Sequence, residues 1–214
     1  MLREVTSYEL FTILMVIGLV FIAIAKLISP KRFDDFIIVI GNSKYLKIYI
    51  KEQKFFDQFD AFLFVNLIIS ASIFGFLIYD FTIRPIEPSV KLMFKLAVGI
   101  SVFILIKVLL ERLIASLFEI DKIIDDYLFQ KITYKNYLGI LLVPINALLL
   151  FSFTPTLHVL YLIVILLLIV NIIGAITTFK PYQSLLKQNL FYFILYLCAF
   201  EIAPYIILYK VFNV

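Results

Sequence analysis

The sequence predicts an all-α fold: a polytopic transmembrane helical bundle of about six spans, with one or two cytoplasmic amphipathic interfacial helices. Composition is the first observation behind this prediction, because hydrophobic residues make up 64% of the 214, charged residues make up 16%, and the mean hydropathy is +1.08. A soluble domain carries about 45 to 50% apolar and about 25% charged residues. The second observation is a series of apolar runs, most of which approach the ~20 residues needed to cross ~30 Å of hydrocarbon. The third is that lysine-rich connections follow every other run. We therefore expect residues 1–214 to form a single integral membrane domain.

Six apolar runs supply the predicted spans. The first covers residues 8–29 and ends before Pro30, because a proline cannot continue the hydrogen bonding of a helix. The other runs are shorter or similar in length, and the fourth is the shortest. They cover approximately residues 60–80, 91–110, 137–153, 157–178 and 190–209.

The distribution of Arg and Lys predicts the orientation, since cytoplasmic loops carry an excess of both. The connections after the first, third and fifth spans hold most of the basic residues: Lys26, Lys31, Arg32, Lys44, Lys47, Lys51, Lys54, Arg112, Lys122, Lys131, Lys135, Lys180 and Lys187. The opposite side holds little beyond Arg3, Arg84, Lys91 and Lys210. We therefore expect both termini to lie outside the cytoplasm.

Residues 44–59 are predicted to form the first interfacial helix. Four lysines fall on one helical stripe opposite aromatic and aliphatic side chains, which is typical of a helix in the plane of the lipid head groups. The stripe is Lys44, Lys47, Lys51 and Lys54. Each lysine near an anionic surface contributes about 1 kcal/mol, so the predicted partner is a bilayer with anionic lipids on its cytoplasmic face. The alternative is a solvated helix face that covers the bundle.

Residues 119–133 are predicted to form the second interfacial helix. Their apolar residues recur at the spacing of an amphipathic helix, and the polar face carries Asp121, Asp125 and Asp126. We expect this acidic face to pair with the lysine stripe. Surface ion pairs usually contribute under ~1 kcal/mol each, so the pairing would set the arrangement of the two helices more than the stability of the protein.

The last apolar run, residues 190–209, holds the costliest polar group in the sequence. Glu201 lies near its middle, and a charged side chain at bilayer depth costs roughly 2.5 to 3.5 kcal/mol, so it must face protein or trapped water. Pro204 follows three positions later and is predicted to kink the helix. Cys198 and Tyr205 share a helical face with Glu201, which puts the tyrosine hydroxyl within reach of the acid.

Aligning the spans by their midpoints predicts an intramembrane polar cluster around Glu201. Asn146 and Asn171 fall within a few ångströms of the same depth, at about 1.5 Å of rise per residue. Pro144 is predicted to kink the fourth helix near Asn146. Lys95, on the outer half of the third span, is the cluster's candidate cation.

On the inner half of the third span, Lys107 and Glu111 are four residues apart and are predicted to satisfy each other. Three interpretations of the polar groups at membrane depth stay open. The first is structural bonding between helices, worth about 0.6 kcal/mol per bond on average. The second is a proton or solute pathway through Glu201. The third is catalysis.

The residue inventory limits the chemistry that the chain can perform. Cys198 is the only cysteine and His158 the only histidine, which excludes an intrachain disulfide, a thiolate cage and most zinc and haem sites. The size is similar to that of rhomboid proteases and CDP-alcohol phosphotransferases, but the serine motif of the former and the glycine-spaced aspartates of the latter are missing. We therefore predict no catalytic, cofactor or metal residues and interpret His158 as structural. The net charge of +4 comes mainly from lysines between the apolar runs and indicates anionic lipid rather than nucleic acid.

The tail from Phe191 to Lys210, FYFILYLCAFEIAPYIILYK, resembles the closing signature of a family of Bacteroidota inner-membrane proteins known as a domain of unknown function, DUF4271. The resemblance covers most of the chain, and it is most distinctive in this tail. The positions carried over from the family are Tyr196, Leu197, Cys198, Glu201, Ile202 and Pro204. The resemblance implies a multi-pass protein of a Gram-negative inner (cytoplasmic) membrane, so both predicted external termini would be periplasmic. It supplies no activity.

The predicted function is that of a non-enzymatic integral inner-membrane protein, a subunit or an assembly or scaffold factor of an envelope membrane complex. Lineage-specific secretion or motility machinery is the context that the resemblance implies. Small size, the missing soluble domain and helix faces rich in Tyr and Phe favour a membrane-protein partner or a homo-oligomer. Two alternatives stay open: a proton- or solute-coupled transporter that uses Glu201, and a lipid-head-group enzyme that uses the cytoplasmic aspartates.

Overall fold

The computed structural model describes residues 9–41, 44–50, 57–82, 88–117, 121–152 and 156–179. Every regular element in these ranges is a helix. In chain order the helices are α1 (Glu9–Ile28), α2 (Pro30–Ile37), α3 (Lys44–Tyr49), α4 (Gln58–Thr82), α5 (Val90–Leu117), α6 (Asp121–Phe151) and α7 (Leu157–Phe179). The all-α prediction is confirmed for this part of the chain.

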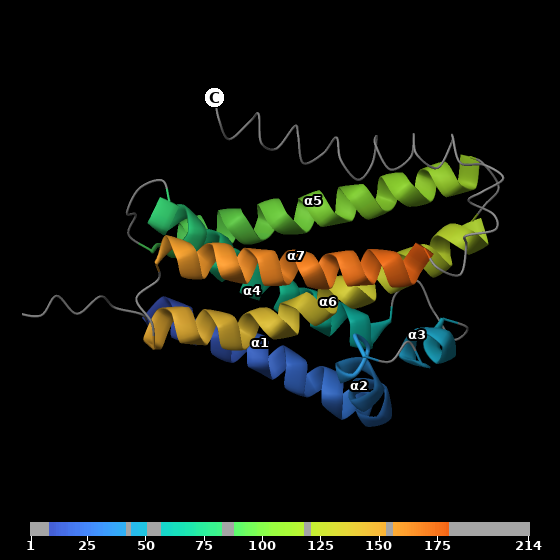
Figure 1. Ribbon diagram of the computed structural model, residues 1–214, viewed down its shortest axis with the longest axis horizontal. Coiled ribbons are helices and arrows are strands. Elements are labelled where there is room, and N and C mark those ends of the chain that lie inside the picture. The colour runs from blue at the N-terminus through green and yellow to red at the C-terminus, as the bar shows by residue number, and fades with distance from the viewer. Residues whose placement is uncertain are drawn as a thin grey trace, which may run out of the picture.

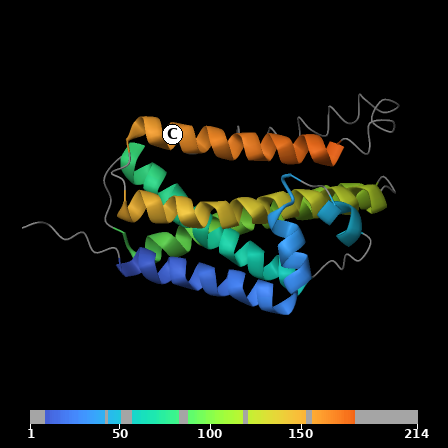
Figure 2. The same cartoon turned by 60° about the horizontal axis from the view of Figure 1, so that its bottom comes forward.

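The five long helices run side by side and alternate in direction, with α4 at the centre of the bundle (Figure 1). Helix α4 packs against α1, α5, α6 and α7. Figure 2 shows α2 and α3 at the end of the bundle where α1 ends and α6 begins. The carboxyl ends of α1 and α5 thus lie at the same end of the bundle, which we call the lysine-rich end because most of the Lys and Arg residues follow these helices in the sequence.

Four described helices, α1, α4, α5 and α6, are long and apolar enough to cross a membrane, and α7 contributes a shorter apolar stretch, His158–Gly174. The class of a helical membrane bundle therefore stands. The sixth predicted span, residues 190–209, lies outside the described residues. Helix α1 ends at Ile28, directly before Ser29 and Pro30, which agrees with the expected stop at that proline.

Two boundaries differ from the sequence prediction. The interfacial helix expected over residues 119–133 and the span expected over 137–153 are one continuous helix, α6, because no helix-breaking residue separates them. Helix α3 has only six residues, and Phe59, which was expected on the same helix, belongs to α4. Pro144 lies inside α6, and the helix continues beyond it to Phe151.

Glycines bring α4 close to its neighbours. An added Cβ on Gly139 of α6 would lie 2.7 Å from the Cα of Leu67, and one on Gly18 of α1 would lie 2.9 Å from the Oδ1 of Asn66. At Gly139 the contact is with backbone atoms of α4, so only glycine fits there, whereas at Gly18 a larger residue would have to displace the Asn66 side chain. Close approach of backbones at small residues is how helices associate where lipid removes the hydrophobic drive between them.

Candidate functional site

A partly buried arginine at the lysine-rich end joins three helices. Arg32 lies on α2, a short amphipathic helix that starts at Pro30, where the fixed φ of proline suits the first helical position. Phe33 and Phe36 on the same helix are buried against Phe59 of α4. This apolar contact docks α2 across the end of α4 and carries the arginine inward with it.

The guanidinium of Arg32 donates to three acceptors. Its Nη1 donates to Asp57, its Nη2 donates to Asp60 Oδ2 at 2.7 Å, and its Nε donates to the Tyr45 hydroxyl at 3.1 Å. Two carboxylates on the two arms of one guanidinium use the fork geometry that lysine lacks. The Arg32 side chain is only 13% exposed, so these charges neutralise one another with little help from water.

Three aromatic rings surround the same guanidinium. The centroids of Phe59, Tyr49 and Tyr45 lie 4.6, 5.3 and 6.0 Å from Arg32 Cζ. Cations within about 6 Å of an aromatic centroid are attracted to its face, more strongly when water is removed. The Tyr49 hydroxyl also donates to Asp35 at 3.4 Å, which ties α3 back to α2.

The aspartates have local roles besides the ion pairs. Asp57 precedes α4 and accepts the backbone N–H of Phe59 at 3.1 Å, which makes it the N-cap of the central helix. Asn136 of α6 donates to the backbone carbonyl of Asp60 at 3.3 Å and to its carboxylate at 3.4 Å. The cluster of Arg32, Asp57, Asp60, Tyr45 and Asn136, here called the Arg32 clamp, therefore joins α2, α3, α4 and α6.

Burial and charge fix the protonation of two clamp residues outside the membrane spans. Burial raises the pKa of Tyr45, and nearby Asp60 raises it further, so the phenol stays protonated. Burial alone would lower the pKa of Arg32, but Tyr45, Asp60 and Asp57 together raise it above its usual value. The clamp holds a permanent cation and has no proton to exchange at Arg32, so its chemistry is that of a structural joint.

A second buried ion pair connects α5 to α6. Lys131 donates to Glu111 Oε1 at 2.5 Å, and the Glu111 side chain is fully buried. Lys107, which was predicted to pair with Glu111, is also buried one turn earlier on α5. The nearby pair of Arg112 and Asp125 is longer, at 3.9 Å, and more exposed. An exposed pair of this kind contributes under ~1 kcal/mol.

Polar side chains also join α4 and α6 at membrane depth. Asn146 is buried and donates to the backbone carbonyl of Ser70 at 2.9 Å, and the Ser70 hydroxyl donates to Asn66 Oδ1 at 3.4 Å. Among the described residues, Asn66 Nδ2 and Asn146 Oδ1 find no hydrogen-bond partner. The contact of Asn146 is of the structural kind that the sequence analysis weighed first.

The other predicted site residues are spread over the structure. Asn171 donates to the carbonyl of Leu167 in its own helix, 3.2 Å away, and its side chain is exposed. Lys95 is exposed on α5, and Lys44 and Lys47 are exposed on α3. Several others lie outside the described residues: Glu201, Cys198, Tyr205, Pro204, Lys51 and Lys54. The intramembrane cluster around Glu201 therefore stays a prediction.

The Arg32 clamp is not apparent in the sequence. In the sequence Arg32 stands out only as one of the basic residues that predict the orientation, and Asp57 and Asp60 do not stand out at all. The available signal was an aspartate in the N-cap position before an apolar run, with a second aspartate one turn later. Nothing in the sequence points to an arginine 25 and 28 residues upstream as their partner. In the described part of the chain, no three His, Cys, Asp or Glu residues come close enough to hold a metal ion.

In the part of the chain that the structure describes, the buried polar joints and the four helices long and apolar enough to cross a membrane are those of a helical membrane bundle. The chain belongs to the family described as a domain of unknown function, DUF4271, whose family model matches residues 11–212. No curated protein and no solved structure matches it.

Proposed function

We propose that the protein is a non-enzymatic subunit or assembly factor of a complex in the bacterial inner membrane, and that α5 is the helix that binds the partner. The observation that supports this proposal is the pattern of exposed residues on one face of α5. Exposed residues recur on it at alternating spacings of four and three, the period of a helix-packing seam. This α5 seam is Lys95, Gly99, Val102, Ile106, Leu109 and Leu113.

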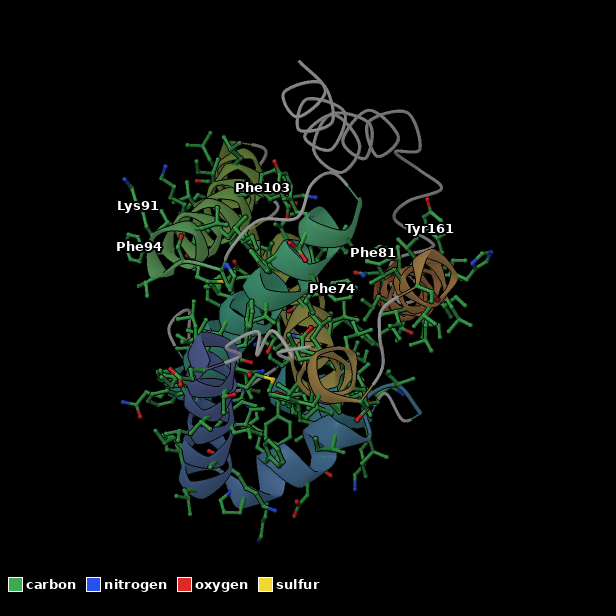
Figure 3. The ribbon with its side chains drawn as sticks, turned by 90° about the vertical axis from the view of Figure 1, so that its left-hand side faces the viewer. Phe74, Phe81, Lys91, Phe94, Phe103 and Tyr161 are labelled. Atoms are coloured by element: carbon green, nitrogen blue, oxygen red, sulfur yellow. The ribbon has the colours of Figure 1, made fainter. Side chains whose placement is uncertain are left out.

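The α5 seam points away from the bundle. In Figure 3, Lys91 and Phe94 of the same helix project outward, whereas Phe74 of α4 lies among the helices. Only 11% of the membrane-length window of α5 is buried, against 44% for α4 and for α6. Helix α5 thus offers most of its length to lipid or to another protein.

Two residues favour a protein over lipid. A glycine inside an exposed helix costs about 1 kcal/mol relative to alanine, and Gly99 has no described atom within 4 Å of where its Cβ would be. Small residues on such a face let a second helix approach closely. Lys95 lies about five residues, roughly 7.5 Å, inside the start of the helix. The partner that fits is an apolar membrane helix with an acidic group near its outer end.

Site-specific photo-cross-linking in native membranes tests this proposal. A photoreactive amino acid at Ile106 should give one discrete adduct with a different protein, and Gly99→Leu should abolish it because the larger side chain blocks approach. The same probe at Val20, which is exposed on α1, should give no discrete adduct. Lipid adducts alone at Ile106, or a stable monomer in mild detergent, would reject the proposal. An adduct of twice the mass of the protein would show that the partner is a second copy of this chain.

We place the lysine-rich end in the cytoplasm and both termini in the periplasm, since basic loops stay inside. Exposed Lys44 and Lys47 at that end would then face anionic lipid. In a Cys198→Ala background, Lys91→Cys should react with an impermeant maleimide on intact spheroplasts. Lys47→Cys should react only after the membrane is permeabilised. The reverse pattern would invert the topology.

A further inference from the structure

Helix α2 does not run along the bundle as the long helices do. Figure 2 shows it crossing the lysine-rich end at a large angle to α1, and in Figure 1 it lies along the lower edge of the molecule. Helix α1 has 20 residues, which rise about 30 Å, the thickness of the hydrocarbon core of a bilayer. Helix α2 begins at Pro30, two residues after α1 ends. In a bilayer that α1 crosses, α2 therefore lies at the boundary between hydrocarbon and head groups.

Isoleucines lie on the outside of α2 and α3. Phe33 and Phe36 of α2 are buried in the aromatic core at this end of the bundle. Ile37 and Ile38, at the carboxyl end of the same helix, are 41% and 58% exposed, and Ile48 of α3 is 39% exposed. The two short helices thus keep the phenylalanines of α2 inside and present three large aliphatic side chains on their surface.

Exposed lysines accompany these isoleucines. Lys31 precedes Ile38 by seven residues, so the two side chains lie on one face of α2, and Lys47 is exposed beside Ile48 on α3. On α2 and α3 the exposed charged residues are Lys31, Lys44, Lys47 and Asp34, three cations against one anion. Apolar side chains with lysines beside them at head-group depth are typical of interfacial binding, and lysines there attract anionic head groups. The anchor surface, as we call it, is Lys31, Ile37, Ile38, Lys47 and Ile48.

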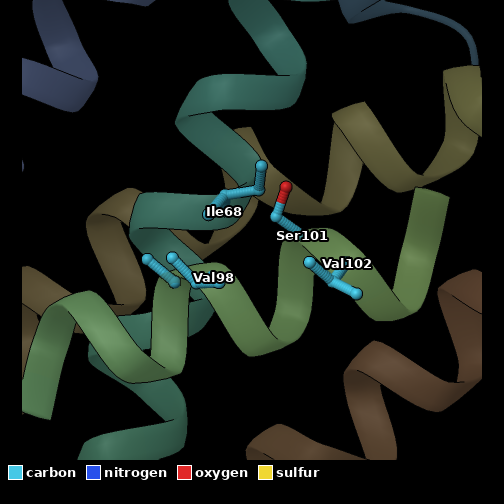
Figure 4. A pocket seen from close by; sticks show the side chains of 5 residues that line it. Ile68, Val98, Ser101 and Val102 are labelled. Carbon is cyan, nitrogen blue, oxygen red and sulfur yellow. The ribbon is translucent and has the colours of Figure 1, made fainter. Parts of the chain in front are cut away.

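The exposed apolar surface of α1 leads directly to this region. Leu27 and Ile28, the last residues of α1, are 79% and 44% exposed, and a membrane span presents such side chains to lipid. A different surface, the groove between α4 and α5, shows the contrast. Its volume is about 250 Å³, and its lining residues are Ile68, Ala97, Val98, Ser101 and Val102 (Figure 4). None of these is charged, so the groove cannot distinguish lipids by charge, whereas the anchor surface can.

We propose that α2 and α3 anchor the bundle to the adjacent leaflet of the bilayer. The isoleucines of the anchor surface enter the edge of the hydrocarbon, and its lysines bind the phosphates of anionic phospholipids. The Arg32 clamp joins both helices to α4 and α6, so the anchor fixes the depth of the whole bundle. This inference extends to α2 the contact with anionic lipid proposed above for Lys44 and Lys47. It depends neither on the α5 seam nor on which end of the bundle is cytoplasmic.

A fluorescent label at Ile38 tests the depth of the anchor. In a Cys198→Ala background, Ile38→Cys is labelled with an environment-sensitive dye, and the purified protein is reconstituted into vesicles of phosphatidylcholine and phosphatidylglycerol. Brominated acyl chains in these lipids quench dyes that lie in the hydrocarbon. We expect quenching at Ile38 to be at least about half of that at Ile17, which is exposed in the middle of α1. Without phosphatidylglycerol, the quenching at Ile38 should fall by about twofold or more.

Two controls define the limits of the measurement. Ser116→Cys is exposed on α5 beyond the membrane window Val90–Leu113, so its dye should be quenched by iodide in water and not by brominated lipid. Lys31→Gln combined with Lys47→Gln should remove the dependence on phosphatidylglycerol. Ile37→Cys is the second reporter in case Ile38→Cys does not fold.

Three results would overturn the proposal. The dye at Ile38 could respond to iodide as it does at Ser116, or it could be shielded from both quenchers, which would place protein over the isoleucines. Equal quenching with and without phosphatidylglycerol would remove the role of the lysines. The vesicles contain no partner protein, so none of these results would bear on the α5 seam.

Discussion

Replacing Arg32 with methionine is expected to destabilise the protein by about 3 to 5 kcal/mol, because it leaves two aspartates without their cation in a mostly buried place. Asp57 and Asp60 would lose their guanidinium contacts, and the rings of Tyr45 and Tyr49 would lose the cation they surround. The change in stability is measured by unfolding the protein in a denaturing detergent and monitoring the loss of its helical circular dichroism signal.

Lysine at the same position is not a conservative substitution. Arg32→Lys keeps the charge but cannot bind both carboxylates and the Tyr45 hydroxyl from one planar group. We expect Arg32→Lys to lose more than half of the stability that Arg32→Met loses.

Lys31→Met is the matched control for the loss of one charge. Lys31 is the exposed neighbour of Arg32 on α2, and its replacement should change stability by under about 0.5 kcal/mol. Asp57→Asn combined with Arg32→Met should recover part of the loss, since one of the two unpaired charges is then removed. Equal stability of Arg32→Met and wild type would show that the clamp does not hold the helices together.

The sequence predicts helices better where hydropathy and burial agree. The end of α1 follows from Pro30, and the apolar windows of α4 and α5 agree with the second and third predicted spans. In α6 hydropathy and burial disagree. Thr133 and Asn136 are fully buried although polar, and hydropathy therefore assigned this stretch to the membrane surface and divided one helix into two.

The candidate site was missed for a related reason. An ion pair between residues 25 positions apart, such as Arg32 and Asp57, depends on how α2 folds back across α4. That arrangement depends on the packing of Phe36 against Phe59, which no local sequence pattern predicts. Asn146 was found because a lone amide inside an apolar run stands out at any distance from its partner. Glu111 was found for the same reason, but its partner Lys131 lies on another helix and could not be assigned from spacing.

Gly139→Ala is expected to destabilise the protein by about 1 to 3 kcal/mol, the usual cost of overpacking. The added methyl would lie 2.7 Å from the Leu67 Cα and 3.1 Å from its backbone nitrogen. Backbone atoms of the central helix cannot turn aside as a flexible side chain does, so α6 must move away from α4. That movement would also lengthen the bond from Asn146 to Ser70, 2.9 Å long in the native bundle.

Gly99→Ala makes the matched comparison, because it adds the same methyl to an open helix face. Alanine is favoured over glycine in a helix interior by about 1 kcal/mol, so this variant should unfold at the same or higher detergent concentration than wild type. The same glycine-to-alanine substitution is therefore expected to lower the stability at Gly139 and to leave it unchanged or raise it at Gly99. Similar shifts for both variants in detergent unfolding would contradict the close contact of α4 with α6 on which the bundle depends.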